Sequence, residues 1–161
     1  MSAVPPLLPP LLCVEPWCDA IVDALYEVFD RDFRQTKPIL DGQEIHYYSK
    51  TRPDGRETIF WHLITTEDAT RSARNPDPSR AARLAWVRFL IEHSTENGVL
   101  LWDLLEHDGA VKTYIWFVSG DFLLIFKKLK DGRRRLLTSF CIKYERYKSG
   151  LEKKYKKRIQ N

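Results

Sequence analysis

Apolar residues recur at helical spacing in the first segment after the proline-rich N-terminus. Pro16 begins this segment, Pro38 ends it, and acidic residues separate the apolar positions. Such spacing predicts an amphipathic helix, and a proline in the first turn together with Asp19 suits a helix N-terminus. The apolar positions are Trp17, Ala20, Ile21, Ala24, Leu25, Val28, Phe29 and Phe33.

Turn residues and β-forming residues dominate the next stretch. Asp41-Gly42 lies between short apolar runs and predicts a hairpin over Pro38 to Tyr48. Pro53-Asp54-Gly55 marks a second turn. The segment after it, Thr58 to Thr65 (TIFWHLIT), is rich in β-formers and predicts a strand.

A polar stretch then precedes a second helix. Thr66 to Ser79 has two prolines and almost no apolar residues, which predicts a loop long enough to be functional or mobile. Ser79 is placed to cap a helix from about Arg80 to His93. Its last part, Trp86 to Ile91, is apolar on too many sides for an amphipathic helix, so we expect deep burial or a partly extended chain.

The second half of the chain predicts an antiparallel meander and a closing helix. Turn residues lie at Gly109, at Ser119-Gly120-Asp121 and at Lys130-Asp131-Gly132. The expected strands are Val99 to Leu105, Lys112 to Val118, Phe122 to Leu129 and Arg135 to Ile142. The closing helix carries a narrow apolar stripe of Tyr144, Tyr147, Leu151, Tyr155 and Ile159.

These elements predict an α+β fold. We expect a sheet of about four to five antiparallel strands with the N-terminal, middle and C-terminal helices packed on one face. A length of 161 residues suits one domain, which we place at residues 16–161. We expect the proline-rich leader at residues 1–15 to be either extended on the surface or an unstructured end. A hydrophobic content of 43% is sufficient for a real core.

Composition indicates a reducing, aqueous location without a metal. No apolar run approaches the roughly 18 residues of a membrane span, and no secretory signal is evident. Cys13, Cys18 and Cys141 are an odd number without zinc-ligand spacing. We therefore expect free thiols, a cytoplasmic location, and neither a cofactor nor a structural metal.

Charge is divided unevenly along the chain. Residues 127–161 hold fourteen Lys/Arg and three Asp/Glu, a balance of +11, whereas the residues before them have a balance of −7. Such a basic segment suits a polyanion, most commonly nucleic acid. A solvated basic helix on an unrelated domain would give the same pattern, and charge alone leaves both interpretations open.

Few side chains suggest chemistry. His62, on the expected strand with Phe60 and Ile64, is a candidate proton acceptor or donor, and the alternative is a core histidine bonded to backbone. Lys127 and Thr138 are expected to lie near each other across the last hairpin. Thr138 and Ser139 must face opposite sides of the sheet.

The remaining titratable candidates have simpler explanations. Arg88 lies among apolar residues and needs an acidic or phosphate partner, for which Glu92 is the structural alternative. We interpret His46, His93 and His107 as having no special role. No nucleotide-binding or metalloprotease motif and no evident pair of carboxylates is present. Among nucleases this leaves the metal-independent type, in which the 2′-OH of RNA is the nucleophile.

The order of segments resembles a known nuclease superfamily. The resemblance is to a phage- and mobile-element-associated branch of the group that contains barnase, EndoU, the tRNA-cutting colicins and the RelE toxins. It is carried by the N-terminal helix and the basic closing helix, and by the segments Phe60 to Ile64, Arg83 to Glu92, the strand containing Trp116, Phe122 to Lys127, and Leu136 to Phe140.

The resemblance implies a helix-then-sheet fold and a metal-independent endoribonuclease of the toxin or phage-effector type. By residue match, His62 would act as general acid or base, and Lys127 (or Lys128) and Arg88 would stabilise charge. Thr138 (or Ser139) would orient the substrate. The sequence lacks an obvious Glu–His pair of the barnase kind, so the acid and base are unassigned.

We therefore predict an RNase that cuts tRNA or ribosome-associated RNA to a 2′,3′-cyclic phosphate. The alternatives are a non-catalytic RNA- or DNA-binding module and a protein-interaction domain for an acidic partner such as an antitoxin or immunity protein. No membrane partner is expected. The candidate nucleic-acid-binding residues are Lys128, Lys130, Arg133, Arg134, Arg135, Lys153, Lys154 and Lys157.

Overall fold

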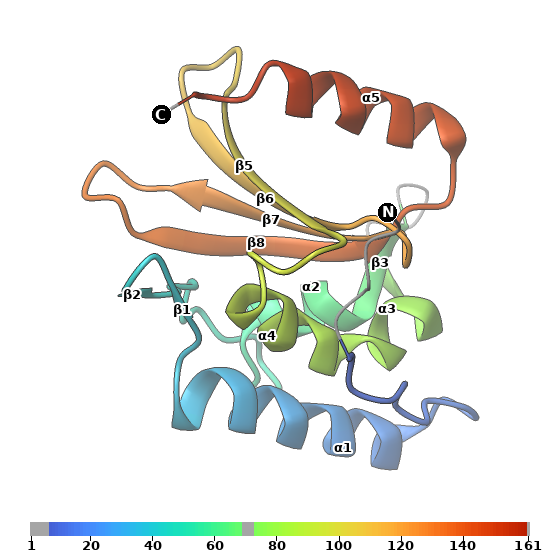
Figure 1. Cartoon of the computed structure of the whole chain (residues 1–161). Coiled ribbons are helices and arrows are strands. Elements are labelled where there is room, and N and C mark those ends of the chain that lie inside the picture. Colours follow the sequence, from blue (N-terminus) through green and yellow to red (C-terminus); the bar gives the residue numbers. More distant parts are fainter. Residues whose placement is uncertain (1–6, 69–72, 161) are drawn as a thin grey trace.

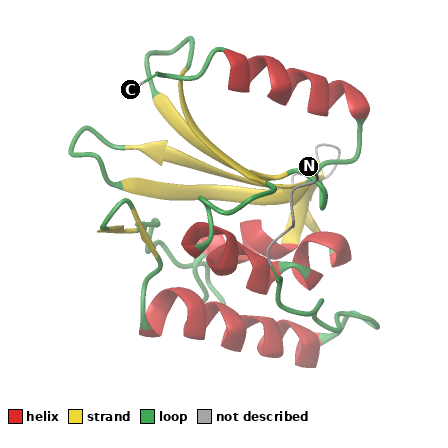
Figure 2. Cartoon of the chain, viewed as in Figure 1, coloured by secondary structure: helices red, strands yellow, loops and turns green. Residues whose placement is uncertain are grey.

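The computed structural model describes residues 7–68 and 73–160. Residues 1–6 of the expected leader, residues 69–72 of the expected loop and residue 161 lie outside this range. The chain combines helices with antiparallel strands, which confirms the α+β class. Helices lie on both sides of the main sheet (Figure 2). Within the described range, no helix has the length and apolar character needed to cross a membrane.

Four antiparallel strands form the main sheet and pair in chain order. They are β5 (Val99–Leu105), β6 (Val111–Phe117), β7 (Phe122–Lys128) and β8 (Arg134–Cys141). Gly109 and Gly132 have φ values of +84° and +90° in the tight turns before β6 and β8, a conformation that favours glycine. A register shift between Ile125 and Phe126 opposes two residues of β7 to three of β8.

Four helices lie on one side of this sheet, the last three against its strands and the first beyond those three (Figure 1). These are α1 (Asp19–Phe29), α2 (Thr58–Ile64), α3 (Pro78–Ala82) and α4 (Leu84–Glu92). The chain continues from α1 through a π-helical turn, η1 (Asp30–Gln35). We call α1 to α4 the N-terminal layer. Its core packs against the apolar side chains of alternate strand positions.

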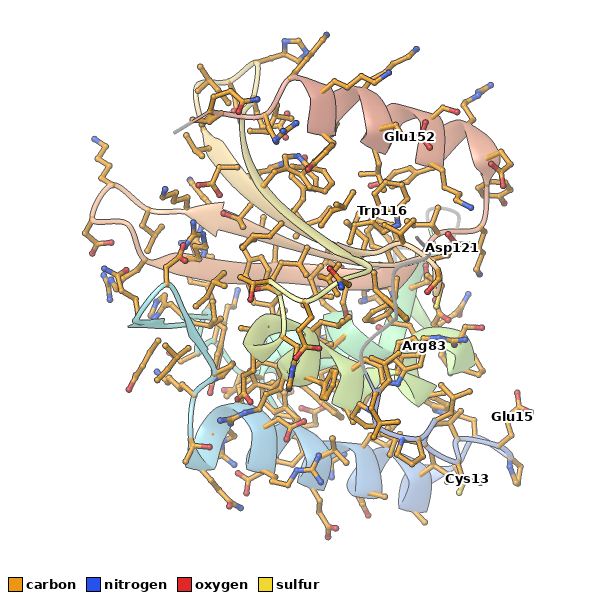
Figure 3. All side chains as sticks on the ribbon, in the orientation of Figure 1. Cys13, Glu15, Arg83, Trp116, Asp121 and Glu152 are labelled. Carbon is orange, nitrogen blue, oxygen red and sulfur yellow. The ribbon has the colours of Figure 1, made fainter. Side chains whose placement is uncertain are left out.

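The closing helix α5 (Glu145–Lys156) lies on the opposite face of the sheet (Figure 1). Its buried Leu151 packs into a second apolar cluster with Trp102, Tyr114 and Trp116, and Trp116 lies between the sheet and α5 (Figure 3). The expectation that all helices share one face was therefore wrong. The apolar stripe of the closing helix has to be buried against another apolar surface. The second face of the sheet provides that surface. We call this side the α5 face.

The segment Thr58 to Thr65, predicted as a strand, is a helix up to Ile64. Its buried residues Ile59, Phe60, Leu63 and Ile64 repeat at helical spacing and face the core. Packing therefore overrides the β-propensity of the sequence. Thr65 begins β3 (Thr65–Asp68), which pairs antiparallel with β4 (Ala73–Pro76), so most of the described part of the predicted loop is in strands.

The helix predicted from Arg80 to His93 is two helices. The helical run is interrupted at Arg83, whose φ of −104° and ψ of 15° separate α3 from α4. Asp77, rather than Ser79, caps α3 by accepting a hydrogen bond from the backbone N–H of Arg80. The apolar stretch that argued against an amphipathic helix is helical and deeply buried in α4.

The N-terminal segments attach to this frame at several points. Strands β1 (Ile39–Leu40) and β2 (Gln43–Glu44) form the expected hairpin at Asp41-Gly42. The backbone N–H of Leu12 donates to the carbonyl of Ala82 at 2.9 Å. The indole of Trp86 donates to the carbonyl of Pro9 at 2.8 Å. The described part of the leader is therefore held against α3 and α4.

A buried polar network links all four strands of the main sheet on the face that the N-terminal layer covers. Arg134 is 7% exposed and donates to Thr113 at 2.8 Å and to Asp103 at 3.2 Å. Lys128 donates to the same Asp103 carboxylate at 2.9 Å, and Asp41 accepts from Arg134 at 2.8 Å. Burial alone would raise the pKa of Asp103, but the hydrogen bonds from Thr113 and Lys128 and the charge of Arg134 hold it below its ordinary value.

Removing the carboxylate at the centre of this network should destabilise the fold. Loss of one partner of a buried ion pair costs about 3–5 kcal/mol, and we expect Asp103→Ala to lie near the lower end because Asp41 still contacts Arg134. Urea unfolding monitored by circular dichroism measures this change. Glu152→Ala, at an exposed position of α5, is the control and should change stability by less than about 0.5 kcal/mol. Equal stability of the two variants would contradict a central role for Asp103.

Candidate functional site

Three cationic side chains stand side by side across three neighbouring strands. Lys112 of β6 is directly opposite Lys127 of β7, and Lys127 is directly opposite Arg135 of β8. Residues that oppose each other in antiparallel strands point to the same face, with Cβ atoms about 4.5–5.5 Å apart. We call Lys112, Lys127 and Arg135 the basic row.

A histidine extends this row by one more position. His46 forms a parallel bridge with Arg135: its N–H donates to the carbonyl of Arg134, and its carbonyl accepts from the N–H of Leu136, both at 2.8 Å. A bridged pair shares one face of the sheet. The segment after β2 therefore adds a short strand to the edge of β8 and places His46 beside Arg135.

Strand alternation places the row and His46 on the α5 face. Ile45 and Tyr47, on either side of His46, pack into the N-terminal core, as does Leu136 beside Arg135. The residues between them must point the other way. On β7, Lys127 likewise alternates with Phe126, which belongs to the same core.

The row has no anionic partner in the described part of the chain. Lys112 and Lys127 make neither an ion pair nor a side-chain hydrogen bond there, and both are partly exposed. The guanidinium carbon of Arg135 lies 3.9 Å from the ring centroid of the exposed Tyr48. Its buried Nε has no hydrogen-bond partner among the described residues. Unpaired cations beside an exposed aromatic ring suit a polyanion with stacking bases.

The environment of His46 favours its neutral form. Burial lowers the pKa of His46 below its ordinary value, and the positive charges of Arg133, Lys37 and Arg135 lower it further. Asp131 acts in the opposite direction and is outweighed. An imidazole that is neutral at physiological pH is able to accept a proton.

The two strand hydroxyls separate as the sequence predicts. Thr138 is opposite Ile125 and lies on the α5 face, one step further along the sheet than the Lys127–Arg135 pair. Lys127 and Thr138 therefore lie within two residues of register, as expected. Ser139 is fully buried on the opposite face, and its Oγ has no hydrogen-bond partner among the described residues. Of the two hydroxyls, only that of Thr138 therefore lies on the same face of the sheet as the basic row.

The other cations of the last hairpin have different surroundings. Lys128 and Arg134 point to the opposite face and bind Asp103, while Arg133 pairs with Asp131 in the turn at 2.8 Å. The exposed Lys130 and the partly exposed Lys127 line a groove of about 700 Å³ at the end of the sheet, between the two hairpin turns, and Asp103 and Asp108 line it too. Among the residues of this hairpin that were predicted to bind nucleic acid, Arg135 belongs to the basic row. Lys130 lies in the turn, three residues from Lys127 of the row.

His62 lies in the N-terminal layer, away from the α5 face. It occupies the last turn of α2, and its carbonyl accepts a hydrogen bond from Arg80 at 2.7 Å. Burial lowers the pKa of His62, and nearby arginines, first Arg74 and then Arg52, lower it further. The structure therefore brings His62 together with neither Lys127 nor Thr138, because the expected strand is a helix.

Arg88 connects two parts of the N-terminal layer. It pairs with Glu92 on α4, and it also donates to the carbonyls of Asp32 at 2.8 Å and Thr36 at 3.0 Å. These carbonyls belong to the end of the π-helical turn, where backbone acceptors need partners. Arg88 thus holds η1 to α4 and lies outside the basic row.

The closing helix also contains both exposed and paired residues among those predicted to bind nucleic acid. Lys153 and Lys157 are exposed. Lys154 turns toward the sheet, where it donates to the hydroxyl of Tyr114 at 3.1 Å and lies 3.9 Å from Glu106. Tyr114 is two residues from Lys112 on β6, so Lys154 approaches the basic row from α5.

His46 is the residue of this candidate site that could not be predicted from the sequence. The alternation of Ile45 and Tyr47, which face the core, with His46 and Tyr48 is a detectable strand signal, but it follows a hairpin turn and is short. The sequence contains no sign that this segment pairs with β8. Within the described residues, no group of three or more His, Cys, Asp or Glu is arranged to hold a metal ion.

Comparison of the chain with family models, with curated proteins and with solved structures gives no significant match. The case for a function therefore rests on the geometry of the α5 face.

Neutralising one cation of the row should raise the pKa of His46. In Arg135→Gln the protonated imidazole no longer meets that positive charge, so protonation becomes more favourable and the pKa moves up toward its ordinary value of about 6.5. A histidine ring titration by NMR follows this shift, with Lys153→Gln on α5 as a charge-matched control. An unchanged or lower pKa in Arg135→Gln would show that the two groups do not interact.

Proposed function

We propose that the α5 face binds RNA and cleaves it without a metal ion, giving a 2′,3′-cyclic phosphate. The observation that carries this proposal is the unpaired basic row of Lys112, Lys127 and Arg135 with His46 at its end. Like charges directly opposite each other in a sheet are destabilising, so a bound polyanion would relieve a repulsion that the fold itself retains. The phosphate backbone of a nucleic acid has the required charge.

The residues of the face can be given roles in this reaction. His46, neutral at physiological pH, takes the proton of the 2′-OH as that oxygen attacks phosphorus. Lys127 and Arg135 stabilise the negative charge that grows on the phosphate oxygens. Thr138, one step along β8, hydrogen-bonds the substrate and orients it.

The bond from phosphorus to the 5′-oxygen breaks as the ring closes, and the leaving oxygen then takes up a proton. Lys127 is separated from His46 by two strand spacings, roughly 10 Å between backbones, which leaves room for a phosphate between the side chains. The ammonium groups of Lys127 and Lys112 are the N–H donors on the side of the row opposite His46. They are the candidates for supplying this proton.

This proposal differs from the sequence-based hypothesis at His62 and Arg88, whose places are taken by His46 and Arg135. His62, which the resemblance suggested as acid or base, lies in the N-terminal layer, and His46 takes that role here. Arg88 holds α4 to η1 and has no proposed role in the chemistry. Lys127 and Thr138 keep the roles that the sequence suggested.

An RNA-binding module without catalysis is the second candidate. The stacking of the exposed Tyr48 on Arg135 favours it, because such a pair offers a platform to a base as well as a cation to a phosphate. Both candidates use the same face, and only cleavage distinguishes them.

The two histidines give the sharpest test of cleavage. Purified protein and its His46→Ala and His62→Ala variants are incubated with total tRNA and with ribosomes in EDTA, and the RNA ends are analysed. We expect wild type and His62→Ala to give fragments with 2′,3′-cyclic phosphate ends. His46→Ala should be slower by about 10²–10⁴-fold, the usual loss for a positioned acid or base.

Circular dichroism of each variant controls for folding. Full activity in a folded His46→Ala variant would remove His46 from the site. Intact RNA with wild type would contradict the nuclease and leave the binding module to be tested by gel shift.

The salt dependence of RNA binding tests the basic row separately from cleavage. For single strands, the slope of log K against log salt changes by about 0.7 for each phosphate contact. We therefore expect the combined variant Lys112→Gln, Lys127→Gln, Arg135→Gln to bind more weakly and with a slope smaller by about 2. Fluorescence anisotropy with a labelled oligoribonucleotide measures both quantities.

The control for this measurement replaces Lys153, Lys156 and Lys157 with Gln, which removes the same charge from exposed positions of the closing helix and its end. A slope that falls equally in both variants would indicate a diffuse charge effect in place of a defined site.

A further inference from the structure

The flank of α5 carries a hollow next to the basic row. It has a volume of about 620 Å³ and mostly apolar walls. Its lining residues come from α5 and the turn before it: Tyr144, Arg146, Tyr147, Gly150, Leu151 and Lys154. We call it the α5 hollow. Two tyrosine rings and two basic side chains in one small surface form an unusual lining for a solvated helix flank.

Gly150 is the residue that the fold does not explain. It lies inside α5, where glycine weakens a helix relative to alanine. A Cβ built on Gly150 meets no atom within 4 Å, so no close packing requires a glycine there. Its φ is not positive either, so no turn requires it. The absence of a side chain at Gly150 has one visible consequence, which is an open α5 hollow.

Contacts across the α5 face place the hollow beside the row. Tyr147 packs on Phe140 of β8 with ring centroids 5.6 Å apart, and Phe140 is two residues from Thr138. At the other end, Lys154 donates to the hydroxyl of Tyr114, two residues from Lys112. Two residues of a strand span about 6.6–6.8 Å. The Lys154 end of the hollow therefore lies near Lys112 of the basic row, and the Tyr147 end lies near Thr138.

We propose that the α5 hollow accepts one unpaired nucleobase of the RNA whose phosphates the basic row holds. This inference rests on the proposed function and adds a substrate class, which is single-stranded RNA. A base has a flat apolar face for the tyrosines, and the adjoining phosphates are attracted by Lys154 and Arg146. The positive charge around the hollow favours this occupant over an uncharged apolar peptide.

Base pairing would prevent this binding. In a duplex the flat faces are stacked on neighbours and only the groove edges are accessible, so a base has to be unpaired to enter an apolar hollow. The protein should therefore prefer single-stranded RNA to a duplex of the same length. The phosphate contacts alone provide no such preference.

Filling the hollow tests the inference. Gly150→Leu places a large side chain in it, and Ser149→Leu adds the same side chain to the exposed position next to it on α5. The probe is a labelled oligoribonucleotide of eight residues, used single-stranded, as a duplex, and with one abasic position scanned along it. Affinity, its salt dependence and the melting temperature of the protein are measured for wild type and both variants.

We expect Gly150→Leu to lose affinity for the single strand by about 5- to 150-fold, the range reported by alanine substitution for one stacked base. The salt dependence of RNA binding and the melting temperature should be the same for Gly150→Leu and Ser149→Leu, because both variants keep the phosphate contacts and the fold. The most damaging abasic position should weaken wild type by a similar factor and leave Gly150→Leu unaffected. The wild-type part of this second comparison alters only the RNA, so it does not depend on the stability of the variant.

The outcomes separate the two proposals. If wild type binds and cuts RNA but Gly150→Leu binds it equally well, the hollow is not a base site and the proposed function stands. Equal affinity of wild type for duplex and single strand would overturn the inference in the same way. If wild type neither binds nor cuts RNA, the proposed function fails and this inference fails with it.

Discussion

The carboxylate of Asp103 determines which basic side chains of the last hairpin are structural and which are free. It binds Arg134 and Lys128 on the N-terminal side of the sheet. Because neighbouring strand residues alternate between faces, burying these two sends Arg135 and Lys127 to the α5 face. A slip of one residue in this pairing would exchange the two sets and leave the carboxylate facing apolar side chains. The register of β7 and β8, and with it the basic row, depends on this buried interaction.

The site that results is electrostatically unfavourable in the free protein. Lys127 directly opposes Lys112 on one side and Arg135 on the other, and cross-strand pairs of like charge are destabilising. The fold compensates by satisfying the neighbouring cations, since Lys128, Arg133 and Arg134 all have carboxylate partners. Local departures from what stability favours are expected at functional sites. The contrast between paired and unpaired cations is thus more informative than the total charge of the segment.

Much of the sheet could be predicted from the sequence, because its strands are long, apolar and separated by turn residues. The helix α2 could not. Its residues have β-propensity, and only the surrounding core decides that Ile59, Phe60, Leu63 and Ile64 share one side of a helix. The closeness of Lys127 and Thr138 could be predicted by local reasoning across one hairpin. The place of His46 beside Arg135 could not, because it depends on a bridge between distant segments.

That bridge has a consequence for how the protein is made. Chains leave the ribosome from the N-terminus, so the histidine emerges long before the strand that positions it. Until β8 has been synthesised and has paired with the segment around His46, the proposed acid–base group and the cations have no common surface. If this face cuts RNA as proposed, the nascent chain is unable to do so before β8 has emerged and paired with the segment around His46.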